Sequence, residues 1–253
     1  MEALQLVEVA HSKGEIGSSD IAAIKVLEQF ISLPANELEE RSSDIRNRLS
    51  AIALESRENH GAVEYSKLEF SRGVLKCPED FFYSRYSLRE FEDKPVAKEV
   101  IERAILLAMK TPSVCNRQAW AVYHASDSKT RDIVLAHQNG NKPFGANVPS
   151  VLVIAADLKA FFTGNEHYQH WIDGGLFSMS LMYAFHSLGL ATCPLNWSQS
   201  PAVDRSLRSK LRIQESHTVI MVMAVGYPDD VNKVCVSARR PLKEVMIDLE
   251  LKK

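Results

Sequence analysis

The longest apolar segment of the chain reads WIDGGLFSMSLMYAFHSL, residues 171–188. Its apolar side chains fall on nearly every side of a 3.6-residue repeat, so the segment predicts a helix that other elements cover all round. Gly189 follows it, at the position where helices commonly end on a residue of positive φ. Asp173 and His186 interrupt the apolar run, which favours a buried helix over one that spans a membrane.

Strand-like segments lie on both sides of this helix in the sequence. Strands are predicted at residues 120–125, 149–156, 217–225 and 234–236, and the second and third of these are almost wholly apolar, as central strands are. Shorter helices are predicted at residues 95–109, 127–137 and 201–211. This mixture predicts an α+β fold in which helices flank a sheet.

The first 80 residues are mostly helical by pattern. Ser18 to Asp20 offer helix caps, and the apolar residues that follow share one side of a helix that ends at Leu33-Pro34. A second helix is predicted at Ala35–Arg57. We therefore expect a helical N-terminal extension, residues 1–80, ahead of a larger unit, residues 81–253.

Composition and charge exclude several classes of protein. The chain has 253 residues, of which 45% are hydrophobic, enough for a sizeable core. Its 30 Lys and Arg against 32 Asp and Glu leave no basic excess for a nucleic-acid partner.

The N-terminus lacks signal-peptide features and no stretch favours membrane insertion, so we expect a cytoplasmic protein. The cysteines have no C-x-x-C spacing and are expected to be buried free thiols: Cys77, Cys115, Cys193 and Cys235.

A metal site is the less favoured interpretation of the histidines. Glu166, His167 and His170 lie close in sequence, but two histidines and an acid are common on exposed helices and metal centres need a fuller ligand set. We therefore expect no metal. Satisfied structural roles are expected for the remaining candidates, His124, His137 and His186.

Four separated segments carry residues suited to chemistry. They read SRYSLREF (84–91), TPSVCNRQAW (111–120), DGG (173–175) with GLATCPLNW (189–197), and SARRPL (237–242). Arg85, Ser87 and Arg89 alternate, so in an extended segment they share one side and suit a phosphate or another anion. Asn116 and Gln118 offer donors and acceptors to the edge of a heteroaromatic ring. Residue type alone leaves the alternatives open: a solvated charged face, a loop cap or a tight turn.

In this order, over residues 81–249, the four segments resemble the flavin-dependent nitroreductase family. The resemblance implies a central, mostly antiparallel sheet flanked by helices and an intertwined homodimer with FMN bound non-covalently at its interface. It also implies hydride transfer from NAD(P)H through FMN to a small organic acceptor, such as a nitroaromatic or a quinone, in a ping-pong cycle. Residues 116–118 and 193–197 look most similar to members encoded with surface-polysaccharide genes.

The resemblance implies a role for each matching residue. Arg85, Ser87 and Arg239 would hold the FMN phosphate, and Tyr86 and Ser113 would be further FMN contacts. The remaining implied FMN contacts are Arg89 near the pyrimidine edge, Asn116 and Gln118 beside the ring, and Pro194, Leu195 and Asn196 along it, with a backbone N–H near N5.

Three of these residues are the expected catalytic ones, namely Arg89, Leu195 and Asn196. The chain departs from the family pattern at Tyr86, where Arg or His is usual, and at Ala119, where Pro is usual. Neither change removes a required donor, although Tyr86 could alter the phosphate end. Substrate choice is expected to depend on residues 158–168, where Phe161, Phe162 and Tyr168 could pack over the flavin.

Two alternative functions stay open beside the reductase. One is a flavin-dependent dehydrogenase that returns electrons to oxygen. The other is a non-catalytic FMN-binding partner of a glycan-assembly system, with the N-terminal helices as its docking element. Those helices could equally cover the dimer of the larger unit, which is the interpretation that we favour.

Overall fold

The chain divides into two compact units in the computed structural model, which describes residues 2–36, 40–52, 64–162 and 164–251. The N-terminal unit is Met1–Lys76 and the C-terminal unit is Cys77–Lys253. No helix in the described ranges is long and apolar enough to cross a membrane.

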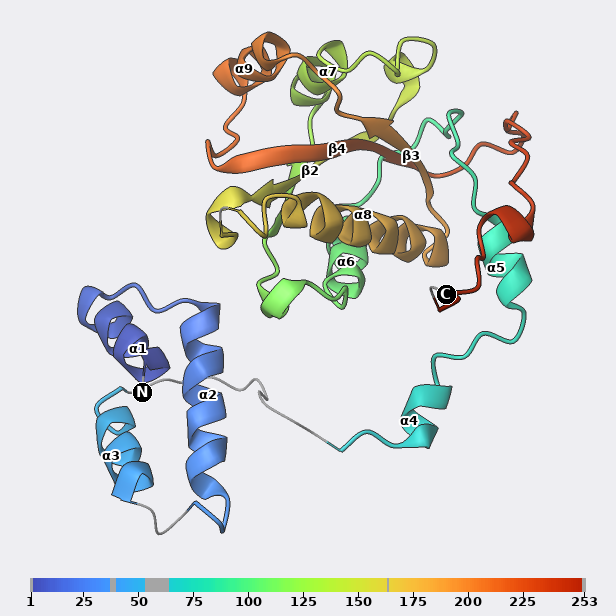
Figure 1. Cartoon of the computed structure of the whole chain (residues 1–253). Coiled ribbons are helices and arrows are strands. Elements are labelled where there is room, and N and C mark those ends of the chain that lie inside the picture. The colour runs from blue at the N-terminus through green and yellow to red at the C-terminus, as the bar shows by residue number, and fades with distance from the viewer. Residues whose placement is uncertain (1, 37–39, 53–63, 163, 252–253) are drawn as a thin grey trace. The chain divides into compact units, whose positions relative to one another are not determined.

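Three helices build the core of the N-terminal unit: α1 (Glu2–Lys13), α2 (Ser18–Ser32) and α3 (Glu40–Leu49) (Figure 1). Their apolar sides meet in a cluster made of Leu4, Val7, Ile24, Ile31, Ile45 and Leu49, which Ile52 joins from just beyond α3. Arg48 of α3 adds a salt bridge of 2.7 Å to Glu8 of α1. The predicted second helix, residues 35–57, corresponds to α3, and its residues 37–39 and 53–57 lie outside the described residues. A short helix, α4 (Lys67–Ser71), follows.

A four-stranded sheet is the centre of the C-terminal unit. Its strands are β1 (Trp120–Ala125), β2 (Ser150–Asp157), β3 (Ala191–Asn196) and β4 (His217–Gly226). They lie in the order β1-β2-β4-β3, and every neighbouring pair is antiparallel. The predicted antiparallel α+β fold is therefore confirmed, with β1 and β3 as the two edges.

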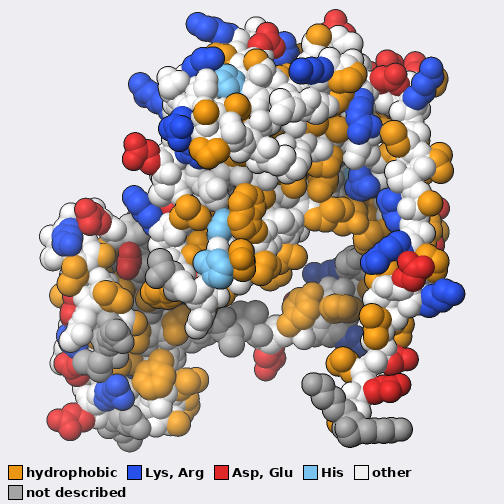
Figure 2. All heavy atoms as spheres, turned by 45° about the horizontal axis from the view of Figure 1, so that its top comes forward, with side chains coloured by type: hydrophobic (Ala, Val, Ile, Leu, Met, Phe, Trp, Pro, Cys, Tyr) orange, Lys and Arg blue, Asp and Glu red, His pale blue; other side chains and the backbone are white. Residues whose placement is uncertain are grey.

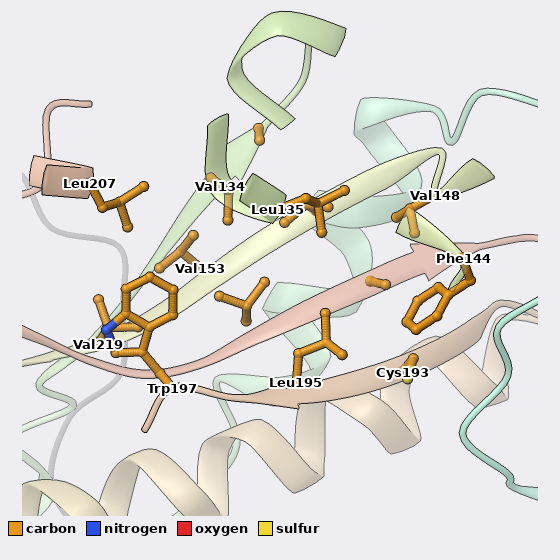
Figure 3. Close-up of a cluster of buried hydrophobic side chains, with 14 of the residues drawn as sticks. Val134, Leu135, Phe144, Val148, Val153, Cys193, Leu195, Trp197, Leu207 and Val219 are labelled. Atoms are coloured by element: carbon orange, nitrogen blue, oxygen red, sulfur yellow. The ribbon is translucent and has the colours of Figure 1, made fainter. Parts of the chain in front are cut away.

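Helices cover both faces of this sheet (Figure 1). On one face α6 (Lys98–Ala108) and α8 (Gln169–Ser187) pack their apolar sides against alternate residues of β2 and β4. On the other face lie α7 (Ser128–Ala136) and α9 (Pro201–Lys210), and Figure 3 shows Val134 and Leu207 of these helices with Val153 and Leu195 of the sheet. Because both faces are covered, the central strands are apolar on both sides, as their sequence indicates.

The long helix α8 is only partly as predicted. Phe177, Leu181 and Phe185 are fully buried, but Trp171 is 46% exposed and Ile172 is 53% exposed. Leu176 is also 46% exposed. The prediction that other elements of the chain bury α8 on every side is therefore wrong for the N-terminal half of this helix. Hydrophobic side chains are visible at the surface in Figure 2.

Two further predictions are corrected by the structure. Residues 234–236 form no strand, since Val236 is 96% exposed and no described segment pairs with them. Three cysteines expected to be buried are exposed, namely Cys77, Cys115 and Cys235. Only Cys193, which lies on a sheet strand, is buried. An isolated apolar run needs a ladder partner to become a strand, and a thiol is buried only where an element covers it.

Candidate functional site

The segment after α5 (Pro78–Ser84) lies against the start of β3 and the end of β4. Ser87 pairs with Thr192 in a parallel bridge, and the Leu88 N–H donates to the Thr192 carbonyl at 3.1 Å. Further along, Phe91 pairs with Pro228 in an antiparallel bridge. The structure therefore brings the predicted anion-binding segment to the edge of the sheet.

Strand β3 contains Pro194, Leu195 and Asn196, the three residues expected to lie along the flavin ring. Thr192 turns its carbonyl away from β4, so strand alternation turns the backbone of Pro194 and Asn196 the same way. Pro194 has no N–H and is tolerated because this strand is an edge. The Asn196 N–H is therefore the first outward amide donor beyond Thr192, while its carbonyl accepts from Gln138 Nε2 at 3.0 Å.

Arg89 lies near the middle of the same strand. Its guanidinium is 5.9 Å from the centre of the Phe144 ring. Burial raises the pKa of the Cys193 thiol, and the positive charge of Arg89 works in the opposite direction. This edge therefore combines an exposed guanidinium with backbone donors, which suits a ligand that carries or develops negative charge.

A cavity of about 240 Å³ opens at the other end of the anion-binding segment. Arg85 and Tyr86 line it together with Ser84 and His186. The sequence predicted a ligand-binding position for Arg85 and Tyr86 and a structural role for His186, and the Nε2 of His186 does lie 3.0 Å from Ser84 Oγ. Nothing in the sequence links His186 to residue 85, because 101 positions separate them.

The loop that leads into β1 has a strained backbone. Cys115, Asn116 and Gln118 have positive φ angles of 49°, 54° and 51°. Two of the hydrogen bonds that hold the loop run from the Val114 N–H to Asp173 Oδ2 (3.2 Å) and from the Gln118 N–H to Ser113 Oγ (3.0 Å). The side chains of Asn116 and Gln118 remain exposed, as a binding role requires.

A second contact ties this loop to the segment before α8. Arg117 forms an ion pair of 2.6 Å with Glu166 and lies over the Phe162 ring, 5.1 Å from its centre. Glu166 also accepts the Phe162 N–H at 2.8 Å. The hydrogen bond from Arg117, followed by that from Phe162, lowers the pKa of Glu166. Sequence reasoning missed this pair and considered Glu166 only as a possible metal ligand.

The histidines have other partners. Within the described ranges no group of three His, Cys, Asp or Glu side chains could hold a metal ion. His124 Nε2 lies 3.0 Å from Ser150 Oγ, and His137 Nε2 lies 3.1 Å from Ser206 Oγ. The structural roles expected for these two residues are confirmed.

The predicted site residues fall into two groups within one chain. The loop with Ser113, Asn116 and Gln118 precedes β1, whereas Pro194 to Asn196 lie on β3 at the opposite edge of the sheet. Three inter-strand spacings, about 14 Å, separate those edges. Arg239 is exposed, and its described hydrogen bond goes to the Ser237 carbonyl of its own segment rather than to Arg85 or Ser87.

The model of the nitroreductase family matches residues 83–138 and 129–227, more than half of the chain. The chain therefore belongs to this family, and its fold is the nitroreductase fold.

The relatives and solved structures agree with that assignment. An Archaeoglobus fulgidus protein named as an NADH dehydrogenase/NAD(P)H nitroreductase is 28% identical over 152 residues, 58% of this chain and 83% of the relative. Iodotyrosine deiodinase of Danio rerio is 26% identical over 225 residues, 75% of this chain and 74% of the relative. A nitroreductase structure from Desulfovibrio desulfuricans in complex with FMN has a TM-score of 0.59 at 19% identity, covers 71% of this chain and all of that one, and shows the shared fold.

Proposed function

We propose that the protein is an FMN-dependent oxidoreductase that passes electrons from NAD(P)H to a small organic acceptor. The observation that carries the proposal is the outer edge of β3, where Arg89 and the outward Asn196 N–H lie beside the segment with Arg85. The family membership and the FMN complex of the Desulfovibrio structure support the choice of cofactor. Bound FMN would supply reversible hydride chemistry, for which the protein supplies position and charge.

The residues present suit each part of FMN. Arg85 can donate two hydrogen bonds to a phosphate, and Ser87 adds a hydroxyl on the same segment. The guanidinium of Arg89 can stabilise negative charge at the pyrimidine edge without a proton transfer. The Asn196 N–H is the donor proposed for N5, because Pro194 offers none and the amide of Leu195 faces β4.

A homodimer would bring the two groups of site residues together. Since Asn116 and Gln118 lie at the edge opposite β3, a second copy is the proposed source of these residues for each flavin. The exposed apolar side chains of Trp171, Ile172 and Leu176 on α8 support the proposal, because association would remove them from water. Ser113 and, on the exposed C-terminal segment, Arg239 are assigned to the same shared site.

The acceptor is proposed to bind over the flavin beside residues 158–168. Phe162 is 72% exposed and Tyr168 is 66% exposed, so aromatic side chains are available to cover a flat substrate. Nitroaromatics and quinones are the first acceptors to test. The likeness to iodotyrosine deiodinase adds iodinated phenols to that set.

Anaerobic spectroscopy of the purified full-length protein tests this function. We expect a yellow protein whose flavin absorbance is bleached by NADH or NADPH and restored by one of the acceptors. In a ping-pong cycle, double-reciprocal plots at several acceptor concentrations are parallel. A protein that takes up no FMN would overturn the proposal, and bound FMN that neither nicotinamide reduces would favour the dehydrogenase or the non-catalytic partner instead.

A further inference from the structure

A histidine and an arginine lie together at the C-terminal end of α8. His186 is in the last turn of the helix, and its Nε2 is 3.0 Å from Ser84 Oγ. Its ring centre is 5.1 Å from that of Phe81 on α5. His186 and Arg85 line the same cavity of about 240 Å³, and none of the described residues that line it is an aspartate or a glutamate.

The environment of His186 disfavours its charged form in the free protein. Burial lowers the pKa of the imidazole, and the positive charge of Arg85 lowers it further. A hydrogen bond to the Phe81 backbone works in the opposite direction. The lowered pKa favours the neutral imidazole while the cavity is without an anion, whereas a phosphate dianion beside it would favour the charged form.

We propose that His186 is a second cation at the phosphate end of the flavin site, and that it becomes protonated when a phosphate ester enters the cavity beside Arg85. This inference rests on the proposed FMN function and adds His186 to the residues assigned to the phosphate end. By linkage, a ligand that favours the protonated imidazole binds with uptake of a proton. FMN therefore binds more tightly as the pH falls from 8 towards 6.

Few other ionisable groups lie around His186. Those on the elements packed against it are Arg85 and Tyr86 on the following segment, Tyr183 on α8, and Glu79 and Asp80 in the first turn of α5. Glu79 and Asp80 are exposed, and neither lines the cavity that His186 and Arg85 share.

Titration of the full-length apoprotein with FMN and riboflavin, from pH 5.5 to 8, tests the proposal. Quenching of flavin fluorescence reports binding without turnover, and riboflavin lacks only the phosphate. In the unchanged protein we expect the Kd for FMN to decrease as the pH is lowered. The decrease should be about tenfold if bound phosphate raises the pKa of His186 by one unit. The Kd for riboflavin should not follow this trend.

The pH dependence of FMN binding could come from the imidazole of His186 or from protonation of the phosphate itself. Three variants distinguish these two sources. His186→Gln should lose the tightening, whereas His186→Lys should bind FMN tightly across the range because its charge is permanent. His124→Gln is the matched control, since His124 also lies 3.0 Å from a serine hydroxyl and burial, followed by the charge of Lys98, lowers its pKa. It should behave like the unchanged protein. Thermal melts of each apoprotein report whether a variant has lost its fold.

Several outcomes would overturn the inference. A His186→Gln protein that keeps the full pH dependence of FMN binding shows that His186 is not involved. Equal changes for FMN and riboflavin mean that the residue acts on the ring or on stability. If inorganic phosphate protects His186 from chemical modification but FMN affinity is unchanged in the variants, the cavity holds free anions only. Failure of the proposed function itself is distinct, because neither flavin would then bind to any of the proteins.

Discussion

Cys115, Asn116 and Gln118 hold a left-handed backbone conformation that only glycine adopts without strain. Such residues cost on the order of 1–3 kcal/mol each and persist only where surrounding contacts hold them. Here the buried Asp173 carboxylate, the Ser113 hydroxyl and the pair formed by Arg117 and Glu166 supply those contacts. The strain therefore sits where the proposed function needs fixed, exposed amide side chains.

The ion pair between Arg117 and Glu166 is expected to stabilise the folded protein. Since the pKa of Glu166 is lowered in the folded state, its stabilising effect is present above the carboxylate's ordinary pKa and is lost as the pH falls through the lowered value. Glu166→Gln should therefore lower the melting temperature slightly at pH 7, and the difference should shrink as the pH falls below the carboxylate's ordinary pKa. Glu102→Gln breaks the more exposed pair with Lys98 and is the control, with no change expected. Equal melting temperatures for both variants at pH 7 would contradict the role of Glu166.

Removal of the Arg85 side chain is expected to weaken the retention of FMN. The loss of one charge-assisted hydrogen bond to a phosphate costs roughly 1.5–3 kcal/mol, so Arg85→Ala should weaken FMN binding by at least about 10- to 150-fold. Flavin released on dilution and gel filtration measures the change. Arg205→Ala, an exposed arginine on α9, should retain FMN fully. Unchanged FMN retention in the Arg85 variant would refute its assignment to the phosphate.

At the scale of elements, α8 approaches the sheet so closely that side-chain size decides the packing. A Cβ added at Gly174 would lie 2.7 Å from Ile220 Cγ1 on β4, whereas one at Gly175 would have nothing within 4 Å. Gly174→Ala should therefore destabilise the protein by about 1–3 kcal/mol. Gly175→Ala should be neutral or stabilise it by up to about 1 kcal/mol. Urea unfolding measures both, and a stable Gly174 variant would show that β4 shifts to make room.

The exposed side of α8 is expected to form part of the interface in the proposed homodimer. Ile172 and Leu176 lie one turn apart on this side, so a charge at either would have to be buried in the proposed homodimer. Ile172→Glu should shift the protein to a monomer in light scattering and release FMN at the same time. Val231→Glu changes a residue that is 78% exposed outside the helices and should leave the mass unchanged. A dimer that survives Ile172→Glu with its FMN would place the interface elsewhere.

At the scale of the whole molecule, the two units have separate hydrophobic cores. We therefore expect two calorimetric transitions in the full chain, of which one disappears on deletion of residues 1–76. The remaining protein should still unfold cooperatively. If it also keeps its dimeric mass, FMN and turnover, the N-terminal unit is a partner module. Loss of the dimer would support the favoured interpretation that these helices cover it, and the absence of any cooperative transition would contradict independent cores.

The sequence determined the elements whose pattern is local. The apolar runs of β2 and β4 can be buried only at the centre of a sheet, and the strands, flanking helices and C-terminal unit follow from that periodicity. The alternation of Arg85, Ser87 and Arg89 also predicted a segment that the structure places against the sheet edge. Among the described residues no strand pairs with residues 234–236, so the same kind of apolar pattern predicted a strand there wrongly.

Only the tertiary structure decided which distant residues meet. It paired Arg117 with Glu166, placed His186 beside Arg85, and set Asn116 at the sheet edge opposite Pro194. It also left Trp171 and Ile172 exposed on a helix whose sequence indicates burial on every side. The physical reason is that periodicity describes one element at a time, whereas a site and an interface depend on the order of strands and on the direction in which each element packs.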